Sequence, residues 1–151
     1  MRILALEPFY DGSHRAFLDG WIRHSRHQWT VAGLPGHSWK WRMRHSAATF
    51  ARQLASSPPE GAAFDATFAS DMLNLAEFRG LAPREISRLP AVVYFHENQL
   101  TYPVRVERER DFHFAYTNFT SCLAADEVWF NSQFHLTDFT AALRDLLRRM
   151  P

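Results

Sequence analysis

Three adjacent side chains with hydrogen-bonding capacity follow an apolar run in the middle of the chain. The run covers residues 91–95 (AVVYF), and His96, Glu97 and Asn98 come directly after it. The imidazole of His96 can donate a hydrogen bond to a sugar hydroxyl or stabilise developing charge, and the Glu97 carboxylate can accept from hydroxyls. These residues predict a site for a polar ligand. The structural alternative is that His96 and Asn98 only satisfy backbone groups of a loop.

A second polar segment, residues 7–15 (EPFYDGSHR), follows the first apolar run. Gly12 permits close approach to the backbone, and the N–H groups near Ser13 and His14 would point out of a helix N-terminus. That combination attracts a phosphate or a polar sugar group. The segment is not GxGxxG, so a dinucleotide site is poorly supported. The alternative is a plain Asp-Gly turn with Ser13 as the helix cap.

A third segment, residues 37–45 (HSWKWRMRH), interleaves aromatic and basic side chains. The residues concerned are Trp39, Lys40, Trp41, Arg42 and Arg44. Basic groups bind phosphates and indoles stack on bases, so this segment could contact RNA. The alternative is a loop whose Trp side chains fill the core and whose charges are solvated. The residues alone favour that alternative, because Trp is usually largely buried.

Short apolar segments alternate with helical patterns along the whole chain. The strands are expected at 2–6, 29–34, 64–70, 91–95 and 127–131. The helices are expected at about 14–26, near 45–55, along a face made of Phe112, Ala115, Tyr116, Phe119 and Leu123, and after a cap at Ser132. This alternation is typical of an α/β fold with a parallel sheet covered by helices on both faces. We predict a Rossmann-like domain with strand order 3-2-1-4-5.

That fold would bring the polar segments together. The segments end different strands, and 70–74 (SDMLN) adds Asp71 and Asn74 to them. In an open parallel sheet, the carboxyl ends of the strands lie at one edge, where ligands bind. With strands 1 and 4 on either side of the switch point, residues 7–14 and 96–103 should face each other across a crevice.

Composition limits the function classes. A chain of 151 residues with net charge +1 fits one globular domain and argues against nucleic-acid binding through bulk charge alone. Its one cysteine, Cys122, excludes an intrachain disulfide and a Cys-based zinc cluster. We expect Cys122 to be a small core residue, and the setting to be reducing and cytoplasmic. The apolar start is too short for a signal peptide or a membrane span.

No metal or other cofactor is expected. His24 and His27 are three residues apart at the end of a helix with no third ligand in sight, and His96, Glu97 and His113 could be assembled only by assumption. The chain also has no nucleophile-elbow motif for Ser-His-Asp chemistry.

Six motifs then occur in a recognisable order. They are LEPFYDGSH, WKWRMR, FASDMLNLAEF, YFHENQLTYPV, ERDF and FNSQFH. Together they resemble the amino-terminal domain of the glycosyltransferase-like family that includes tRNA-queuosine alpha-mannosyltransferase. The resemblance extends over residues 2–151.

The resemblance implies a GT-B glycosyltransferase related to the retaining family 4 enzymes. Such enzymes have two Rossmann-like domains, of which the first mainly holds the acceptor and the second most of the nucleotide sugar. The family enzyme moves mannose from GDP-mannose to queuosine in a tRNA anticodon. Such an enzyme needs neither a protein nucleophile nor a metal, because the departing phosphate can help deprotonate the acceptor while the protein supplies positioning and electrostatics.

The resemblance also assigns roles to residues. The catalytic pair would be His96 and Glu97. Donor and sugar contacts would come from Gly12, Ser13, His14, Asn98 and Ser132. Acceptor or RNA contacts would come from Trp39, Lys40, Trp41, Arg42, Arg44, Asp71 and Asn74. For the aromatic and basic segment, the resemblance therefore favours RNA contact over core packing.

The chain ends about where the family would enter its donor domain. We therefore expect a single amino-terminal domain, 1–151, that lacks the carboxyl-terminal donor-binding domain and is inactive alone. A separate donor domain could be its partner. Three other hypotheses stay open: a glycosyltransferase half with a different acceptor, a non-catalytic RNA- or nucleotide-binding module, and a flavodoxin-like or regulatory domain. The last is disfavoured because no flavin loop or phosphorylatable acidic pocket is recognisable.

Overall fold

The computed structural model of the chain describes residues 1–57, 63–106, 108 and 110–150. The strands are β1 (Arg2–Glu7), β2 (Gln28–Gly33), β3 (Ala66–Ser70), β4 (Ala91–Phe95) and β5 (Glu127–Phe130). The helices are α1 (Gly12–His24), α2 (Trp39–Ser56), α3 (Leu75–Leu81), α4 (Arg84–Ser87), α5 (Phe112–Ala124) and α6 (Gln133–Arg149). Strands and helices therefore alternate as the sequence predicted.

All five strands form one parallel sheet, so the predicted α/β, Rossmann-like class is confirmed. The predicted order 3-2-1-4-5 is wrong, because the observed order is β2-β1-β3-β4-β5. Burial explains the difference: β3 is buried along almost its whole length and needs neighbours on both sides, whereas β2 is only half-buried and lies at an edge. The topological switch point therefore lies between β1 and β3.

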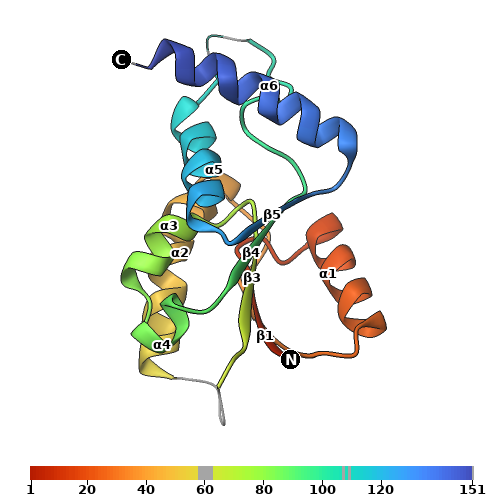
Figure 1. Cartoon of the computed structure of the whole chain (residues 1–151), viewed down its shortest axis with the longest axis vertical. Helices are drawn as coiled ribbons and strands as arrows, with labels where there is room; N and C mark the ends of the chain where they lie inside the picture. The colour runs from red at the N-terminus through yellow and green to blue at the C-terminus, as the bar shows by residue number, and fades with distance from the viewer. Residues whose placement is uncertain (58–62, 107, 109, 151) are drawn as a thin grey trace.

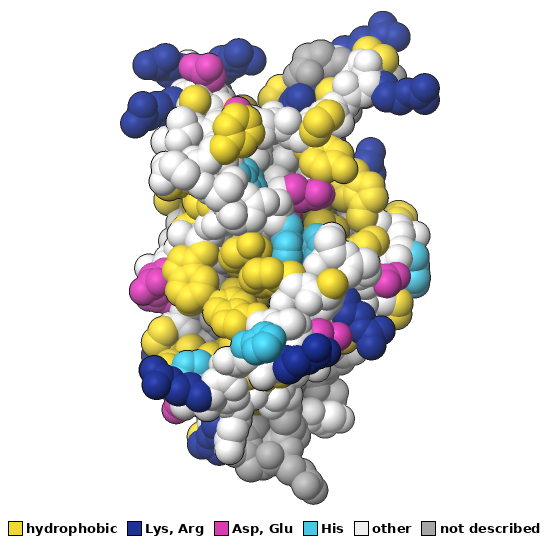
Figure 2. All heavy atoms as spheres, turned by 90° about the vertical axis from the view of Figure 1, so that its right-hand side faces the viewer, with side chains coloured by type: hydrophobic (Ala, Val, Ile, Leu, Met, Phe, Trp, Pro, Cys, Tyr) yellow, Lys and Arg dark blue, Asp and Glu magenta, His cyan; other side chains and the backbone are white. Residues whose placement is uncertain are grey.

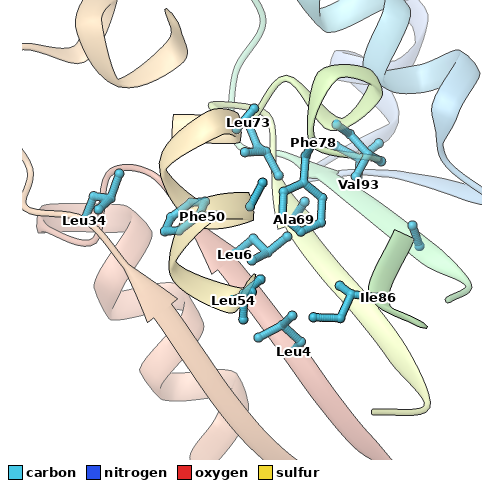
Figure 3. Packing of buried hydrophobic residues seen from close by; sticks show 14 of the residues in the cluster. Leu4, Leu6, Leu34, Phe50, Leu54, Ala69, Leu73, Phe78, Ile86 and Val93 are labelled. Atoms are coloured by element: carbon cyan, nitrogen blue, oxygen red, sulfur yellow. The ribbon is translucent and has the colours of Figure 1, made fainter. Parts of the chain in front are cut away.

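Helices cover the two faces of the sheet unequally. Figure 1 shows α1 on one side and α2 to α5 on the other. The main core lies on the latter side, where Leu6 of β1 and Phe50 of α2 meet Phe78 of α3 (Figure 3). Ala5, next to Leu6 in β1, belongs to the smaller aromatic core under α1, as expected where successive strand residues point to opposite faces.

The second helix begins earlier than the predicted 45–55. It starts at Trp39, so the aromatic and basic segment forms the first turns of a helix and not a loop. Its N-cap, Ser38, makes no side-chain cap bond and has a positive φ of 53°. Trp41 does not fill the core, since its side chain is 71% exposed.

The buried face of α5 overlaps the predicted one only in part, at buried Ala115 and half-buried Phe119. Its buried residues are Phe114, Ala115, Thr117, Asn118 and Ser121, whereas Phe112, Tyr116 and Leu123 are exposed. Hydrogen bonds to the chain after β3 decide this orientation. Asn118 Nδ2 donates to the Asp71 carbonyl at 3.0 Å, and Ser121 Oγ accepts from Leu75 N at 3.1 Å. Buried backbone groups need such partners, so they outweigh apolar periodicity.

The last helix has the predicted cap. Ser132 Oγ accepts a hydrogen bond from His135 N at 3.1 Å. Apolar residues of α6, led by Phe139, pack against Leu100 and against Ala115 of α5. This packing puts the α6 N-terminus beside the loop that follows β4. None of the described helices is both long and apolar enough to cross a lipid bilayer.

Candidate functional site

Polar segments gather where β1, β3 and β4 end. They border two cavities that share Glu97 and Tyr102. The α1-side cavity, of about 230 Å³, is lined by Phe9, Ser13, His14, Trp39, Met72, Glu97, Gln99 and Tyr102. The α6-side cavity, of about 540 Å³, is lined by His96, Glu97, Asn98, Thr101, Tyr102, Pro103, Asn131, Ser132, Phe134, His135 and Asp138.

The loops after β1 and β4 meet, as the sequence predicted. The rings of His14 and His96 lie 4.1 Å apart between centroids. They meet although β3 lies between their strands. The turn after β3 is buried, with Asp71 only 1% exposed, so it does not separate the two rings. The prediction is confirmed because the carboxyl ends of all parallel strands lie at the same edge, whatever the strand order.

The buried carboxylate of Glu7 contacts the ring of His14. Glu7, the last residue of β1, is 2% exposed, and its Oε1 lies 3.3 Å from His14 Nδ1. The same oxygen accepts hydrogen bonds from Ser70 Oγ and Phe9 N, each at 2.9 Å. The His14–Glu7 contact is long for a hydrogen bond, and His14 Nδ1 has no other partner within the described chain, so we treat the contact as an ion pair.

The two histidines differ in charge preference. Burial lowers the pKa of His14, but the ion pair with Glu7 and the charges of Asp71 and Glu97 raise that pKa above its usual value overall. For His96, burial and then the charge of His14 lower the pKa to about 4. At neutral pH, the ring of His96 is therefore uncharged, and it lies beside the ring of His14, which favours the protonated form.

The backbone of His96 is fixed on both sides. Its N–H donates to Asp71 Oδ1 at 3.0 Å, and its carbonyl accepts from Asn131 Nδ2 at 2.6 Å. Its partly buried neighbour Glu97 lines both cavities, and burial raises the pKa of that carboxyl. Glu97 therefore offers a carboxyl group to both cavities, whereas Asp138 borders only the α6-side cavity.

Asp71 lies under the rim, where its burial does not favour a direct contact with RNA. Burial raises the pKa of Asp71 to about 7, and its Oδ2 has no hydrogen-bond partner within the described chain. In the unfolded chain this carboxyl loses its proton near pH 3.8, so between about pH 4 and 7 the folded state binds more protons. The Asp71 contribution to stability therefore falls as pH rises through that window.

Replacing Asp71 by Asn tests this charge. The amide oxygen of the new side chain keeps an acceptor for His96 N, but the amide cannot ionise. We expect the free energy of unfolding of Asp71→Asn, relative to the parent chain, to rise by roughly 1–3 kcal/mol between pH 4 and 8. Urea denaturation at several pH values measures this difference. A pH-independent difference would show that Asp71 is already ionised near pH 4 in the folded chain.

Asn98 is buried in the loop that it organises. Its Oδ1 accepts from Leu100 N at 3.0 Å and Thr101 N at 2.9 Å, and its Nδ2 lies 2.8 Å from His135 Nε2. With 3% of its surface exposed, Asn98 shapes the edge of the α6-side cavity from within. Its predicted contact with the sugar remains a prediction.

His135 is a site residue that the sequence reasoning did not single out. Besides Asn98, its ring contacts Asn131, with Nδ1 3.1 Å from Asn131 Oδ1. We assign the proton to Nδ1, because Nε2 faces the donating amide of Asn98. The only sequence signal was its place in FNSQFH, three residues after the cap at Ser132.

The residues of the aromatic and basic segment have two kinds of position: some lie at or near the α1-side cavity, and others hold the β2–α2 loop in place. Trp39 lines the α1-side cavity, and its ring lies 5.3 Å from that of Phe114. Arg44 also covers Phe114, with its guanidinium carbon 4.7 Å from the ring centroid. Arg42 instead supports the β2–α2 loop, since it donates to the Pro35 carbonyl at 3.0 Å and also contacts two histidines. Exposed Lys40 lies beside the Trp39 ring.

The remaining predicted residues lie at helix starts. Gly12 opens α1 with a positive φ of 51°. The N-cap of α1 is Asp11, which accepts from Gly12 N at 2.8 Å, so the expectation of a Ser13 cap was wrong. Ser13 is exposed beside the α1-side cavity. Asn74 caps α3 by accepting from Glu77 N, and it lines neither cavity.

One group within the described chain has donor atoms close enough to consider a metal. Oxygen and nitrogen atoms of Glu7, His14 and His96 lie within 4.8 Å of one another. The donors are not free, however, because Glu7 Oε1 already serves His14, Ser70 and Phe9 N. A cation would have to displace the proton of His14, so the group fits an internal ion pair better than a metal site.

The fold and the site define a Rossmann-like domain with a polar, partly aromatic cleft at its switch point. Comparison with known proteins identifies its family. Residues 2–151 match the family described as tRNA-queuosine alpha-mannosyltransferase N-terminal, and the chain belongs to that family.

Similarity to one curated relative supports the assignment. The chain is similar to tRNA-queuosine alpha-mannosyltransferase of Drosophila melanogaster, with 42% identity over 150 residues. The match covers 99% of this chain but 38% of the fly enzyme. No solved structure matches the chain. The resemblance that the motifs indicated is thus confirmed at the level of the family.

Proposed function

We propose that this domain is the acceptor-binding half of a retaining GT-B glycosyltransferase that moves mannose from GDP-mannose to queuosine in a tRNA anticodon. Membership of the family carries the proposal. Since the chain spans 38% of the fly relative, we place most of the donor site in sequence beyond the matched region. We place the reaction in the cytoplasm.

The α1-side cavity suits the acceptor. Three aromatic side chains, of Phe9, Trp39 and Tyr102, line it beside polar Ser13 and Gln99. Aromatic rings stack on unpaired bases, and polar neighbours fix their orientation. We assign this cavity to the modified base of the anticodon loop.

Basic groups for the RNA backbone lie near that cavity. Lys40 and Arg44 are exposed on the first turns of α2, close to Trp39 and Phe114. On the face drawn in Figure 2, Lys and Arg side chains lie mainly toward the edges, around hydrophobic patches and central histidine. This distribution supports a binding mode in which charge holds phosphates at the periphery while aromatic groups hold the base.

The transferred sugar would lie at His96 and Glu97. In the proposed step, the bond between the sugar carbon and the donor phosphate breaks, and a bond to the acceptor hydroxyl oxygen forms on the same face. The acceptor proton passes to the departing phosphate. Uncharged His96 donates to a sugar hydroxyl, and the start of α1 offers the backbone N–H of Ser13 near the phosphates. No metal enters this scheme.

If the donor site lies mostly in another region, the chain alone should not catalyse mannose transfer. With GDP-mannose and queuosine-containing tRNA, we expect no acceptor-dependent release of GDP by the 151-residue chain. Adding the remaining sequence of the fly relative, joined to or mixed with the chain, should restore it. Release of GDP by the chain alone, dependent on the acceptor, would contradict the assignment of the donor site to another region.

A further inference from the structure

The pair of Glu7 and His14 has no role in the function proposed so far. Both side chains are largely buried, at 3% exposure for Glu7 and 10% for His14, and the His14 ring lies against that of His96 at 4.1 Å. Burying a carboxylate is costly, and it is tolerated when the group is paired and hydrogen-bonded. Glu7 meets both conditions through His14 and Ser70. A pair of this kind fixes a positive charge at one place under the cleft.

Three carboxyl groups, from three different elements, raise the pKa of His14. Glu7 approaches from β1, Asp71 from the turn after β3, and Glu97 from the loop after β4. The pKa of the neighbouring His96 is lowered, first by burial and then by the charge of His14, since two imidazolium rings in contact would repel each other. Of the two adjacent rings, His14 beside Glu7 is therefore the one that favours the charged form.

We propose that Glu7 is a positioning residue that holds His14 as a buried cation against His96, so that His96 stays uncharged and can exchange hydrogen bonds with a sugar hydroxyl in the cleft. The sugar part of this inference rests on the proposed function, whereas the division of charge does not. A neutral imidazole has one donor and one acceptor nitrogen, so it can recognise a hydroxyl group, which also donates and accepts. A charged ring could only donate.

Titration of the histidine rings tests the division of charge without any ligand. The chain would be labelled at histidine and followed by NMR from about pH 3 to 9, so that points lie on both sides of each expected midpoint. In the parent chain, the midpoint of His14 should lie above the ordinary value of 6.5, and that of His96 near 4. Midpoints near 6.5 for both rings would overturn the proposal, whatever the domain binds.

Two substitutions separate the partners. In Glu7→Gln, the amide preserves size and an acceptor for Phe9 N, and the midpoint of His14 should fall by roughly one pH unit or more. In His14→Gln, the midpoint of His96 should rise by a similar amount. Glu85→Gln, the same change at an exposed position on α4, should move neither ring. A His14 midpoint unchanged in folded Glu7→Gln would overturn the role of Glu7.

Two further arms separate this inference from its alternatives. Zinc ions added to the parent chain should leave both titrations in place; loss of both transitions at one equivalent of zinc would replace the ion pair by a metal site. If the midpoints are as predicted but the domain does not prefer a queuosine-containing stem-loop, the charge division stands and the proposed function fails. If the domain prefers the queuosine-containing stem-loop but the midpoints differ from those predicted, the proposed function stands and the charge division fails.

Discussion

Replacing Trp39 by Ala should weaken binding of a queuosine-containing anticodon stem-loop by about 5- to 150-fold, the loss expected for one stacked base. The indole lines the α1-side cavity with Phe9 and Tyr102, where we place the modified base. Stacking on an aromatic side chain contributes about 1–3 kcal/mol per base, which corresponds to that range of affinity. Fluorescence anisotropy with a labelled stem-loop at constant salt measures the change.

Trp129 provides a matched control. Its side chain is 39% exposed, against 38% for Trp39, and it lies on β5, outside both rim cavities. Trp129→Ala should leave the affinity within about twofold of that of the parent chain, because surface changes away from a site have small effects. Equal losses in the two variants would mean that binding depends on general stability or nonspecific stacking, and the α1-side cavity would lose its assignment.

Replacing Asn98 by Ala should lower the free energy of unfolding by about 2–4 kcal/mol, as expected when several buried polar groups lose a partner. The change removes the acceptor for two backbone N–H groups, of Leu100 and Thr101, and the partner of His135 Nε2. Each buried polar group left without a partner costs about 1–3 kcal/mol. Urea denaturation measures the loss, and the loop edge shared by the two cavities should lose its shape in the same variant.

Gln99→Ala is the control in the same loop. The backbone N–H of Gln99 donates to Asn118 and its carbonyl accepts from Arg110, and both bonds survive removal of the side chain. We expect less than about 0.5 kcal/mol of destabilisation, as for ordinary partly exposed positions. If the two variants were equally stable, the hydrogen bonds of Asn98 would not stabilise the chain, and its role as organiser of the loop would be contradicted.

The sequence predicted the features that depend on local pattern. Short apolar runs bounded by turn residues placed all five strands to within a few residues. The meeting of His14 and His96 followed from one rule, that parallel strands end at a common edge. This prediction holds although the predicted strand order was wrong, since β3 ends in a buried turn at Asp71 that does not separate the two rings.

Features that depend on tertiary contacts were missed. The place of β3 between β1 and β4 reflects burial on both sides, which alternating strands and helices do not reveal. On α5, Asn118 and Ser121 are buried because they bind the chain after β3, a demand that apolar periodicity cannot show. Glu7 was missed because a carboxylate at a strand end looks solvent-exposed until its partners Ser70 and His14 are known.

Recognition of the acceptor is the property on which the proposed function of this domain depends. Its most direct test is equilibrium binding of the purified chain, at stated salt, to a queuosine-containing anticodon stem-loop, to the same stem-loop without the modification, and to GDP-mannose. We predict a clear preference for the modified stem-loop and little affinity for GDP-mannose. Equal, salt-sensitive binding of both stem-loops would reveal only a general electrostatic RNA surface and would contradict the proposed function.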